Sequence, residues 1–173
     1  MWSTSQIFSV CILFAVCPDS AAAYSNVYGE ELQPCSLQGM SLTGFTRNGH
    51  CVDQQDDMGS HHICIDLGSA SGGNFCQVTG QPNWCAGDGP CDGGDGSAVA
   101  GTCPIRNWCV CQWAFASYLE RAGGCDAVQE IVCKAINKEA VTAYRQISGE
   151  RKYVDALRCI EKRCGISVQE STM

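Results

Sequence analysis

The sequence predicts an α+β fold, with short strands and disulfide-tied loops in the N-terminal half and about three helices in the C-terminal half. Three observations lead to this class. Fifteen of the 173 residues are cysteine. Between residues 26 and 66, glycine, proline and asparagine break the chain into short apolar pieces. After residue 107, apolar side chains recur with the spacing of a buried helix face.

The high cysteine content indicates an oxidising compartment, because disulfides persist in secreted proteins and are rare in the cytosol. The C-x-x-C pairs that are typical of zinc and iron–sulfur proteins are absent from the sequence. We therefore favour disulfides as the reason for the cysteines and keep metal binding as the alternative.

The first 23 residues have the pattern of a signal peptide. The run from Ile7 to Val16 is apolar but too short to cross about 30 Å of hydrocarbon as a helix, and the small residues Ala21-Ala22-Ala23 follow it. We expect residues 1–23 to be removed, so that the mature chain begins at Tyr24. The protein is then secreted or resides in the lumen of the secretory pathway, without a transmembrane anchor. A short buried helix is the alternative for this run.

Residues 24–149 are expected to form one domain with a cysteine-rich insertion at 68–104. The piece from Ser60 to Leu67 alternates with a period of two and predicts a strand. We expect the insertion to bury little apolar area and to be mobile between its cysteine ties, because it is rich in glycine and aspartate. A motif of asparagine, an aromatic residue and cysteine occurs three times, and we interpret each copy as a turn whose ring covers a disulfide. The copies are Asn74-Phe75-Cys76, Asn83-Trp84-Cys85 and Asn107-Trp108-Cys109.

Three apolar faces with helical spacing make up the C-terminal half. The first runs from Trp108 to Tyr118 and ends at Gly123-Gly124. The second is expected over residues 126–148. The third starts at about Glu150 and ends at Gly165, so residues 150–173 are predicted to be a C-terminal helix and tail.

Charge is unevenly distributed along the chain. Residues 24–105 hold nine acidic side chains and a single base, Arg47, whereas residues 106–173 hold ten bases and eight acids. No phosphate-binding surface is indicated, so we expect no nucleic acid partner. Two aspartate runs lack the spacing of an EF-hand loop and leave calcium only as an alternative ligand. They are Asp53, Asp56 and Asp57, and Asp88, Asp92 and Asp95.

The common catalytic motifs are absent, so the catalytic residues stay unknown. The sequence has no G-x-S-x-G elbow, no P-loop and no H-E-x-x-H motif. The candidate metal residues are His61, Cys64, Cys109 and Cys111, and His50, Cys51 or Cys35 could complete the set of nitrogen and sulfur ligands that zinc prefers. In an oxidising compartment these sulfurs pair with one another unless a metal binds first, so we expect no cofactor and keep zinc as the alternative.

An ordered series of short motifs resembles a known family. The motifs are Asn26-Val-Tyr-Gly29, Leu32-Gln-Pro-Cys-Ser36, Leu42-Thr-Gly-Phe45, Arg47-Asn-Gly49, Gly59-Ser-His61, Cys64, Trp108-Cys-Val-Cys111 and the helix around Ile131 to Val141. Over roughly residues 26–147 they are similar to the family known as domain of unknown function 2237. The resemblance implies a compact α+β domain and supplies no activity. This chain has His50 before Cys51, where the family often has paired cysteines.

The cysteine count predicts one unpaired thiol. Removal of residues 1–23 leaves thirteen cysteines, an odd number. Eight of them lie outside the family-like motifs, and we assume that they form four bridges among themselves, although connectivity cannot be read from a sequence. The unpaired thiol is then one of Cys35, Cys51, Cys64, Cys109 and Cys111. Such a thiol could be reactive, a metal ligand, a link to a second chain, or buried and inert.

Two functions from different classes remain. The first is a secreted binding or structural domain without catalysis, whose extracellular ligand is a carbohydrate or a protein. Trp84, Trp108 and Trp113 could stack on sugars in such a domain, although a tryptophan beside a disulfide is more often part of the core. The second is a metal- or thiol-dependent enzyme, or a metal-binding protein, centred on the histidine and cysteine set named above. We favour the first because the sequence contains no catalytic constellation.

Overall fold

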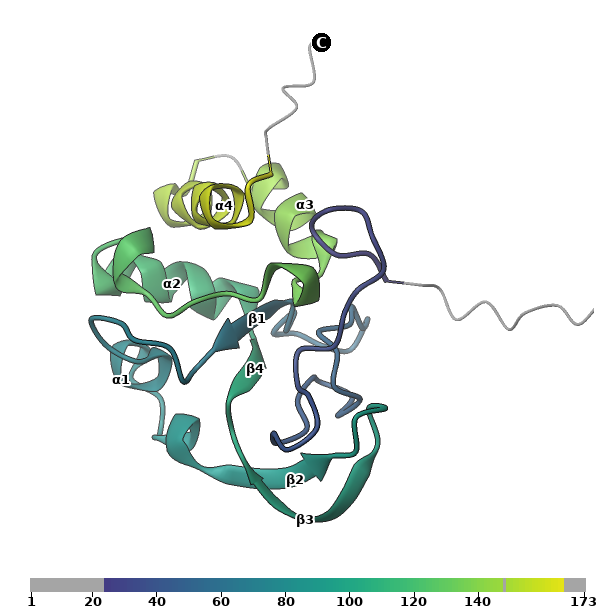
Figure 1. The fold of residues 1–173 in the computed structure, drawn as a ribbon. Helices are drawn as coiled ribbons and strands as arrows, with labels where there is room; N and C mark the ends of the chain where they lie inside the picture. The colour runs from purple at the N-terminus through teal and green to yellow at the C-terminus, as the bar shows by residue number, and fades with distance from the viewer. Residues whose placement is uncertain (1–23, 148, 167–173) are drawn as a thin grey trace, which may run out of the picture.

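The computed structural model describes residues 24–147 and 149–166, and the predicted signal peptide lies outside the described residues. The fold is α+β, as the sequence predicts. Its two pairs of short antiparallel strands lie below a layer of helices (Figure 1). None of the helices in the described residues is both long and apolar enough to cross a membrane.

The strands form two separate ribbons. In the first, β1 (Ile63–Asp66) pairs with β4 (Asn107–Val110), and in the second, β2 (Asp88–Asp92) pairs with β3 (Ala98–Pro104). The β1–β4 pair contributes buried side chains to the core, whereas β3 is almost entirely exposed. The first ribbon therefore belongs to the centre of the fold, and the second is an outlying hairpin.

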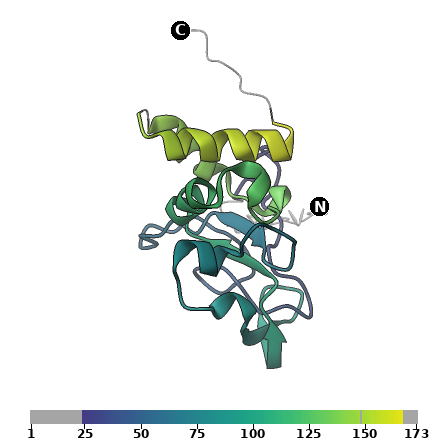
Figure 2. The same cartoon turned by 90° about the vertical axis from the view of Figure 1, so that its left-hand side faces the viewer.

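Four α-helices complete the described chain. α1 (Phe75–Thr79) packs against α2 (Gln112–Ala122), and α4 (Arg151–Cys164) packs against both α2 and α3 (Lys138–Gln146). Figure 2 shows α4 across the top of the molecule and the outlying hairpin at the opposite end. The main core lies between these helices and the β1–β4 ribbon. Its largest fully buried side chains include Tyr118, Tyr144, Phe75, Phe115, Ile63 and Leu119.

The second predicted helix begins only at Lys138. The residues before it lie along the free edge of β1, where the Asp66 N–H donates to the Glu130 carbonyl (2.8 Å) and the Val132 N–H donates to the Cys64 carbonyl (2.9 Å). Buried backbone groups at a strand edge need partners, and residues 128–132 supply them by staying extended between two short 3₁₀ helices, Cys125–Ala127 and Cys133–Ala135. The first predicted helix is shortened for the same reason, because its first turn is strand β4 instead.

The insertion divides into two parts. In the first part, α1 carries Phe75 into the core, where the side chain is 1% exposed and its ring meets that of Tyr118 edge-on at 5.4 Å. The expectation that the insertion buries little apolar area is therefore wrong for this part. The second part is the β2–β3 hairpin, whose β3 side chains are exposed.

Six disulfides connect twelve of the thirteen described cysteines. The cysteines outside the family-like motifs pair with one another as Cys76–Cys85, Cys91–Cys103, Cys125–Cys159 and Cys133–Cys164. The remaining bridges are Cys35–Cys64 and Cys51–Cys109. Among the described cysteines, Cys111 has no disulfide partner. Two of these bridges join α4 to residues 125 and 133, so the C-terminal helix is covalently fastened to the domain.

Candidate functional site

The three asparagine–aromatic–cysteine motifs meet in space. The rings of Phe75 and Trp84 lie 6.0 Å apart, and those of Trp84 and Trp108 lie 5.7 Å apart, between centroids. The Cys76–Cys85 disulfide holds the first two motifs together, and the third begins strand β4. A row of three aromatic rings therefore runs from the core to the surface.

Arg47 covers the outer end of this row. Its guanidinium carbon lies 4.8 Å from the Trp108 ring centroid, a distance at which a cation is attracted to an aromatic face. The backbone of Arg47 has a φ of 53°, in the left-handed region that side chains other than glycine rarely adopt. Residues held in such conformations cluster at binding sites and active sites. Arg47 is also the only base among residues 24–105.

Beside the ring row lies a cavity of about 500 Å³, which we call the tryptophan pocket. This volume is within the range of small-molecule sites. The apolar side chains of its wall are Leu42, Trp84, Pro90, Ile105 and Trp108. Its polar side chains are Ser41, Arg47, His61, Gln81 and Asp88. The pocket therefore combines aromatic rings with both hydrogen-bond donors and acceptors.

Ser41 is a buried residue of this wall with an unused hydroxyl. The residue is 0% exposed, and its Oγ has no hydrogen-bond partner among the described residues. The hydroxyl faces Gly89 of β2, where a Cβ atom would lie 2.3 Å away. Buried hydroxyls are rarely left unpaired, because desolvation without a partner costs about 1 to 3 kcal/mol. Because Ser41 is fully buried, its hydroxyl is out of reach of a ligand in the pocket.

His61 is oriented by a carboxylate. Its Nδ1 lies 2.7 Å from Oδ1 of Asp57, and its ring stacks on Phe45 with centroids 6.1 Å apart. In the neutral ring, Nδ1 then carries the proton and Nε2 is left as an acceptor. Burial raises the pKa of the Asp57 carboxyl. Hydrogen bonds from the backbone N–H and the ring of His61 and from the Gly59 N–H outweigh this effect, so the pKa lies below its ordinary value.

The zinc set proposed from the sequence is not assembled in the structure. His61 lines the tryptophan pocket, whereas Cys64 and Cys109 face each other across the β1–β4 ribbon and are bonded to Cys35 and Cys51. In these disulfides neither sulfur is a thiolate, which is the form that binds a metal. Of the other histidines, His62 is buried, with Nδ1 at 2.8 Å from Gln112 and Nε2 at 3.0 Å from Asp53.

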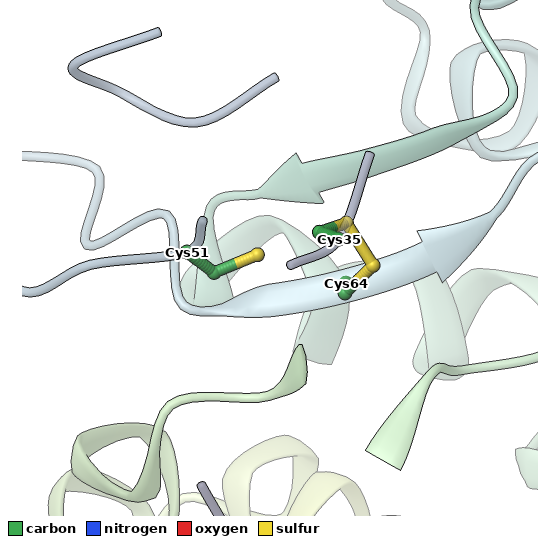
Figure 3. A group of neighbouring side chains, drawn as sticks. All are labelled: Cys35, Cys51 and Cys64. Carbon is green, nitrogen blue, oxygen red and sulfur yellow. A yellow bond between two sulfur atoms is a disulfide. The ribbon is translucent and has the colours of Figure 1, made fainter. Parts of the chain in front are cut away.

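The sulfurs that do gather belong to a different set. The Sγ atoms of Cys35, Cys51 and Cys64 lie within 4.8 Å of one another (Figure 3). Cys51 is bonded to Cys109, so the two disulfides lie side by side. We call these four residues the sulfur cluster. Each is at most 2% exposed, and together with Ala135 they form a second, smaller core.

The unpaired Cys111 stands just before the first residue of α2 and is half-buried. Burial raises the pKa of the Cys111 thiol. Hydrogen bonds from the N–H groups of Ala114 and Trp113 lower this pKa, and the negative charge of Asp57 raises it. The net shift is upward from a value of 9.0, so the thiol is protonated at neutral pH. A thiol in that state is a poor nucleophile.

A second cavity of about 540 Å³ lies between α2 and α4. Four cationic side chains surround it, but each already pairs with a carboxylate. The pairs are Arg151–Asp155, Lys152–Glu150, Arg158–Asp155 and Lys162–Asp126. Exposed pairs of this kind are typical of a solvated helix surface, so we place the candidate site in the tryptophan pocket.

Several residues of this pocket were predicted to be functional from the sequence, but not as one site. His61 was predicted to bind zinc, and Trp84 and Trp108 to stack on sugars. Ser41 and Arg47 were missed as site residues. One signal was available for Arg47, because a single base in a strongly acidic half of the chain needs a reason for its position.

The geometry described so far defines a class of protein: a disulfide-stabilised α+β domain with an aromatic surface pocket. The comparison with known families then identifies the family. Residues 25–148 match the family described as an uncharacterized protein conserved in bacteria (DUF2237), and the chain belongs to that family. No curated protein matches the chain. The matched segment contains the whole tryptophan pocket and ends before α4.

Proposed function

We propose that this chain is a secreted binding domain without catalytic activity, and that it binds a carbohydrate in the tryptophan pocket. One observation carries the proposal. Two tryptophan rings and the guanidinium of Arg47, whose backbone is strained, meet at a cavity of about 500 Å³.

The chemistry of the wall favours a sugar. Carbohydrates present apolar C–H faces that pack on aromatic rings, together with hydroxyls that both donate and accept hydrogen bonds. The pocket offers the ring of Trp84, donors from Arg47 and acceptors from Asp88 and the His61 Nε2. A wholly apolar ligand would leave these polar groups without partners.

The same contacts count against an enzyme. Among the described residues, the Ser41 hydroxyl makes no hydrogen bond to His61, so the pocket contains no nucleophile paired with a base. The Cys111 thiol has a raised pKa. Cys64 and Cys109 are held in disulfides. The thiol-dependent alternative therefore has no activated nucleophile in this form of the protein.

Secretion is supported by the six disulfides, which need an oxidising compartment to persist. The intact mass of protein collected from the culture medium tests this part. We expect a mass that corresponds to a chain starting at Tyr24 with twelve cysteines oxidised. Soluble extracellular protein that retains Met1 would contradict it.

Binding is tested by screening the secreted protein against an oligosaccharide array and measuring the affinity of each hit by calorimetry. Arg47→Ala is expected to weaken binding at least tenfold, because it removes the donor at the mouth of the pocket. Arg106→Ala is the matched control, since Arg106 is exposed and does not line the pocket. Trp84→Ala is compared in the same way with Trp113→Ala, whose ring packs on Tyr144 and Tyr153 instead.

Three outcomes would overturn the proposal. No oligosaccharide binds, or Arg47→Ala and Arg106→Ala weaken binding equally, or a bound sugar is released as a cleaved product. If no oligosaccharide binds but the chain captures a purified extracellular protein, and Arg47→Ala abolishes that capture, the pocket binds a protein ligand instead.

A further inference from the structure

We infer that the sulfur cluster is a zinc site when its two disulfides are reduced, with Cys35, Cys51, Cys64 and Cys109 as the four ligands. The site is distinct from the tryptophan pocket and does not depend on the function proposed there. It also differs from the zinc set suggested by the sequence, since it contains neither His61 nor Cys111.

The spacing of the sulfurs carries the inference. The Sγ atoms of Cys35, Cys51 and Cys64 lie within 4.8 Å of one another (Figure 3). The fourth sulfur, that of Cys109, is bonded to Cys51. In a tetrahedral site with zinc–sulfur bonds of about 2.3 Å, neighbouring sulfurs are about 3.8 Å apart. Small side-chain rotations that follow cleavage of the two disulfides can therefore surround one ion.

The backbone would keep the four cysteines in place without the disulfides. Cys64 and Cys109 are directly opposite residues of the β1–β4 ribbon. The Cys109 N–H donates to Thr43 Oγ1 at 2.9 Å. The Cys35 N–H donates to the Gly49 carbonyl at 2.8 Å.

The fourth cysteine is fixed in the same manner. The carbonyl of Cys51 accepts a hydrogen bond from Nδ2 of Asn137 at 3.1 Å, and Asn137 is 1% exposed. All four ligands thus come from segments that are tied by hydrogen bonds to neighbouring elements. A preorganised set of this kind binds a metal more tightly than a flexible chain with the same ligands.

Burial means that the four reduced sulfurs can be thiolates only with a metal ion beside them. The four cysteines are at most 2% exposed, and the hydrophobic residues that pack with them are Ala135 and Val132. Four thiolates close together in such a place would repel one another and lack solvation. A zinc ion cancels two of the four negative charges, and the tetrahedral coordination uses every sulfur.

The change between the two forms is balanced. A phosphine reductant gives two electrons to each disulfide and takes the oxygen of one water, so that each S–S bond becomes two thiols and the phosphine becomes its oxide. Zinc then replaces the four thiol protons, which are released to solvent. The cluster therefore has an oxidised, cross-linked form and a reduced, zinc-loaded form.

The experiment uses the secreted chain, reduced with a trialkylphosphine in the presence of Co²⁺ as a spectroscopic probe and then Zn²⁺. We expect one equivalent of Co²⁺ to give the intense visible bands of tetrahedral thiolate coordination, and one equivalent of Zn²⁺ to remove them. The Cys35→Ser/Cys64→Ser variant should lose the bands. The control variant Cys91→Ser/Cys103→Ser, which lacks a bridge outside the cluster, should retain them.

A second measurement on the unchanged sequence avoids the question of whether the first variant folds. The zinc-loaded, reduced protein is alkylated and its peptides are mapped by mass spectrometry. We expect Cys35, Cys51, Cys64 and Cys109 to be protected, and a chelator to expose them. Protection of other cysteines instead, no effect of the chelator, or equal loss of the cobalt bands in both variants would overturn the inference.

Discussion

The sulfur cluster and the β2–β3 hairpin are both cross-linked, but in different surroundings. In the cluster, Cys51–Cys109 closes a sequence separation of 58 residues and is buried on all sides. In the hairpin, Cys91–Cys103 closes a separation of 12 residues, and the strand that carries Cys103 is almost entirely exposed. The first bridge connects parts of the domain that are distant in sequence, whereas the second shapes a local turn. The difference shows that the value of a cross-link depends on the length of chain it closes and on what packs around it.

Removal of one bridge from each region should give the largest effect. By loop-closure entropy, Cys51→Ala/Cys109→Ala is expected to lower the free energy of unfolding by about 4 kcal/mol, and Cys91→Ala/Cys103→Ala by about 3 kcal/mol. The first variant also loses buried sulfur contacts, which adds about 1 kcal/mol or more. Urea unfolding followed by circular dichroism measures both. An equal or greater loss in the hairpin variant would contradict the comparison.

Two asparagine caps test the same contrast at smaller scale. Asn137 caps α3 by accepting from the Glu139 N–H (3.0 Å) and also donates to the Cys51 carbonyl of the cluster, whereas Asn74 caps α1 in the insertion by accepting from the Gln77 N–H (2.8 Å). Asn137→Ala should cost about 2 kcal/mol, because it removes the cap and leaves a buried carbonyl unpaired. Asn74→Ala should cost about 1 kcal/mol. Equal shifts of the urea midpoint in the two variants would show that the cluster contact adds nothing.

Two aspartates, one buried and one in the exposed hairpin, test whether burial changes how stability depends on pH. The pKa of buried Asp57 lies below 3.8, so its ionised form stabilises the fold above that pH and the contribution is lost as the pH falls through the folded-state pKa. Asp57→Asn should therefore destabilise the protein by about 1 kcal/mol at pH 6, and this difference should begin to shrink only below pH 3.8 and vanish once the pH is below the folded-state pKa. Asp95, whose pKa is lowered by hydrogen bonds from Ser97 at the fully exposed hairpin turn, serves as the control. Asp95→Asn should change the pH dependence of the urea midpoint less, because its hydrogen bonds are exposed to solvent, and an equal change in both variants would contradict the prediction.

The smallest effect is local opening of the hairpin. Mild reduction should expose residues 93–97 to protease before any cut occurs within α3 or α4, because this turn has few apolar contacts and strand β3, which follows it, is exposed. Mass spectrometry of the first fragments identifies the site of cleavage. A first cut within α3 would show that the helical layer opens more readily than the hairpin.

Local patterns account for the parts of the fold that the sequence predicted. The strand around Ile63 follows from alternation, and α4 follows from its amphipathic spacing and its end at Gly165, whose φ of 63° suits glycine. The motif series placed the chain in its family, which the match over residues 25–148 confirms. Each of these signals lies within a short stretch of chain, so neighbouring residues are enough to read it.

The site depended on contacts between distant segments. The aromatic row joins Phe75, Trp84 and Trp108, and Arg47 reaches it from a turn that no spacing rule connects to them. The pairing of the cysteines could not be read from local sequence patterns either, because thirteen cysteines allow many pairings. Only the packing of β1 against β4 brings Cys64, which is bonded to Cys35, beside Cys109, which is bonded to Cys51.

By itself, the sequence determined that the protein is a cysteine-rich α+β domain of this family, since composition, periodicity and motif order are properties of the chain alone. The tertiary structure decided where those residues meet. It kept residues 128–132 extended, because the edge of β1 needed hydrogen-bond partners that an α-helix would have used internally. The tertiary structure also brought four sulfurs into one small core and two tryptophans to one pocket, because residues from distant parts of the chain bury their apolar surface against one another.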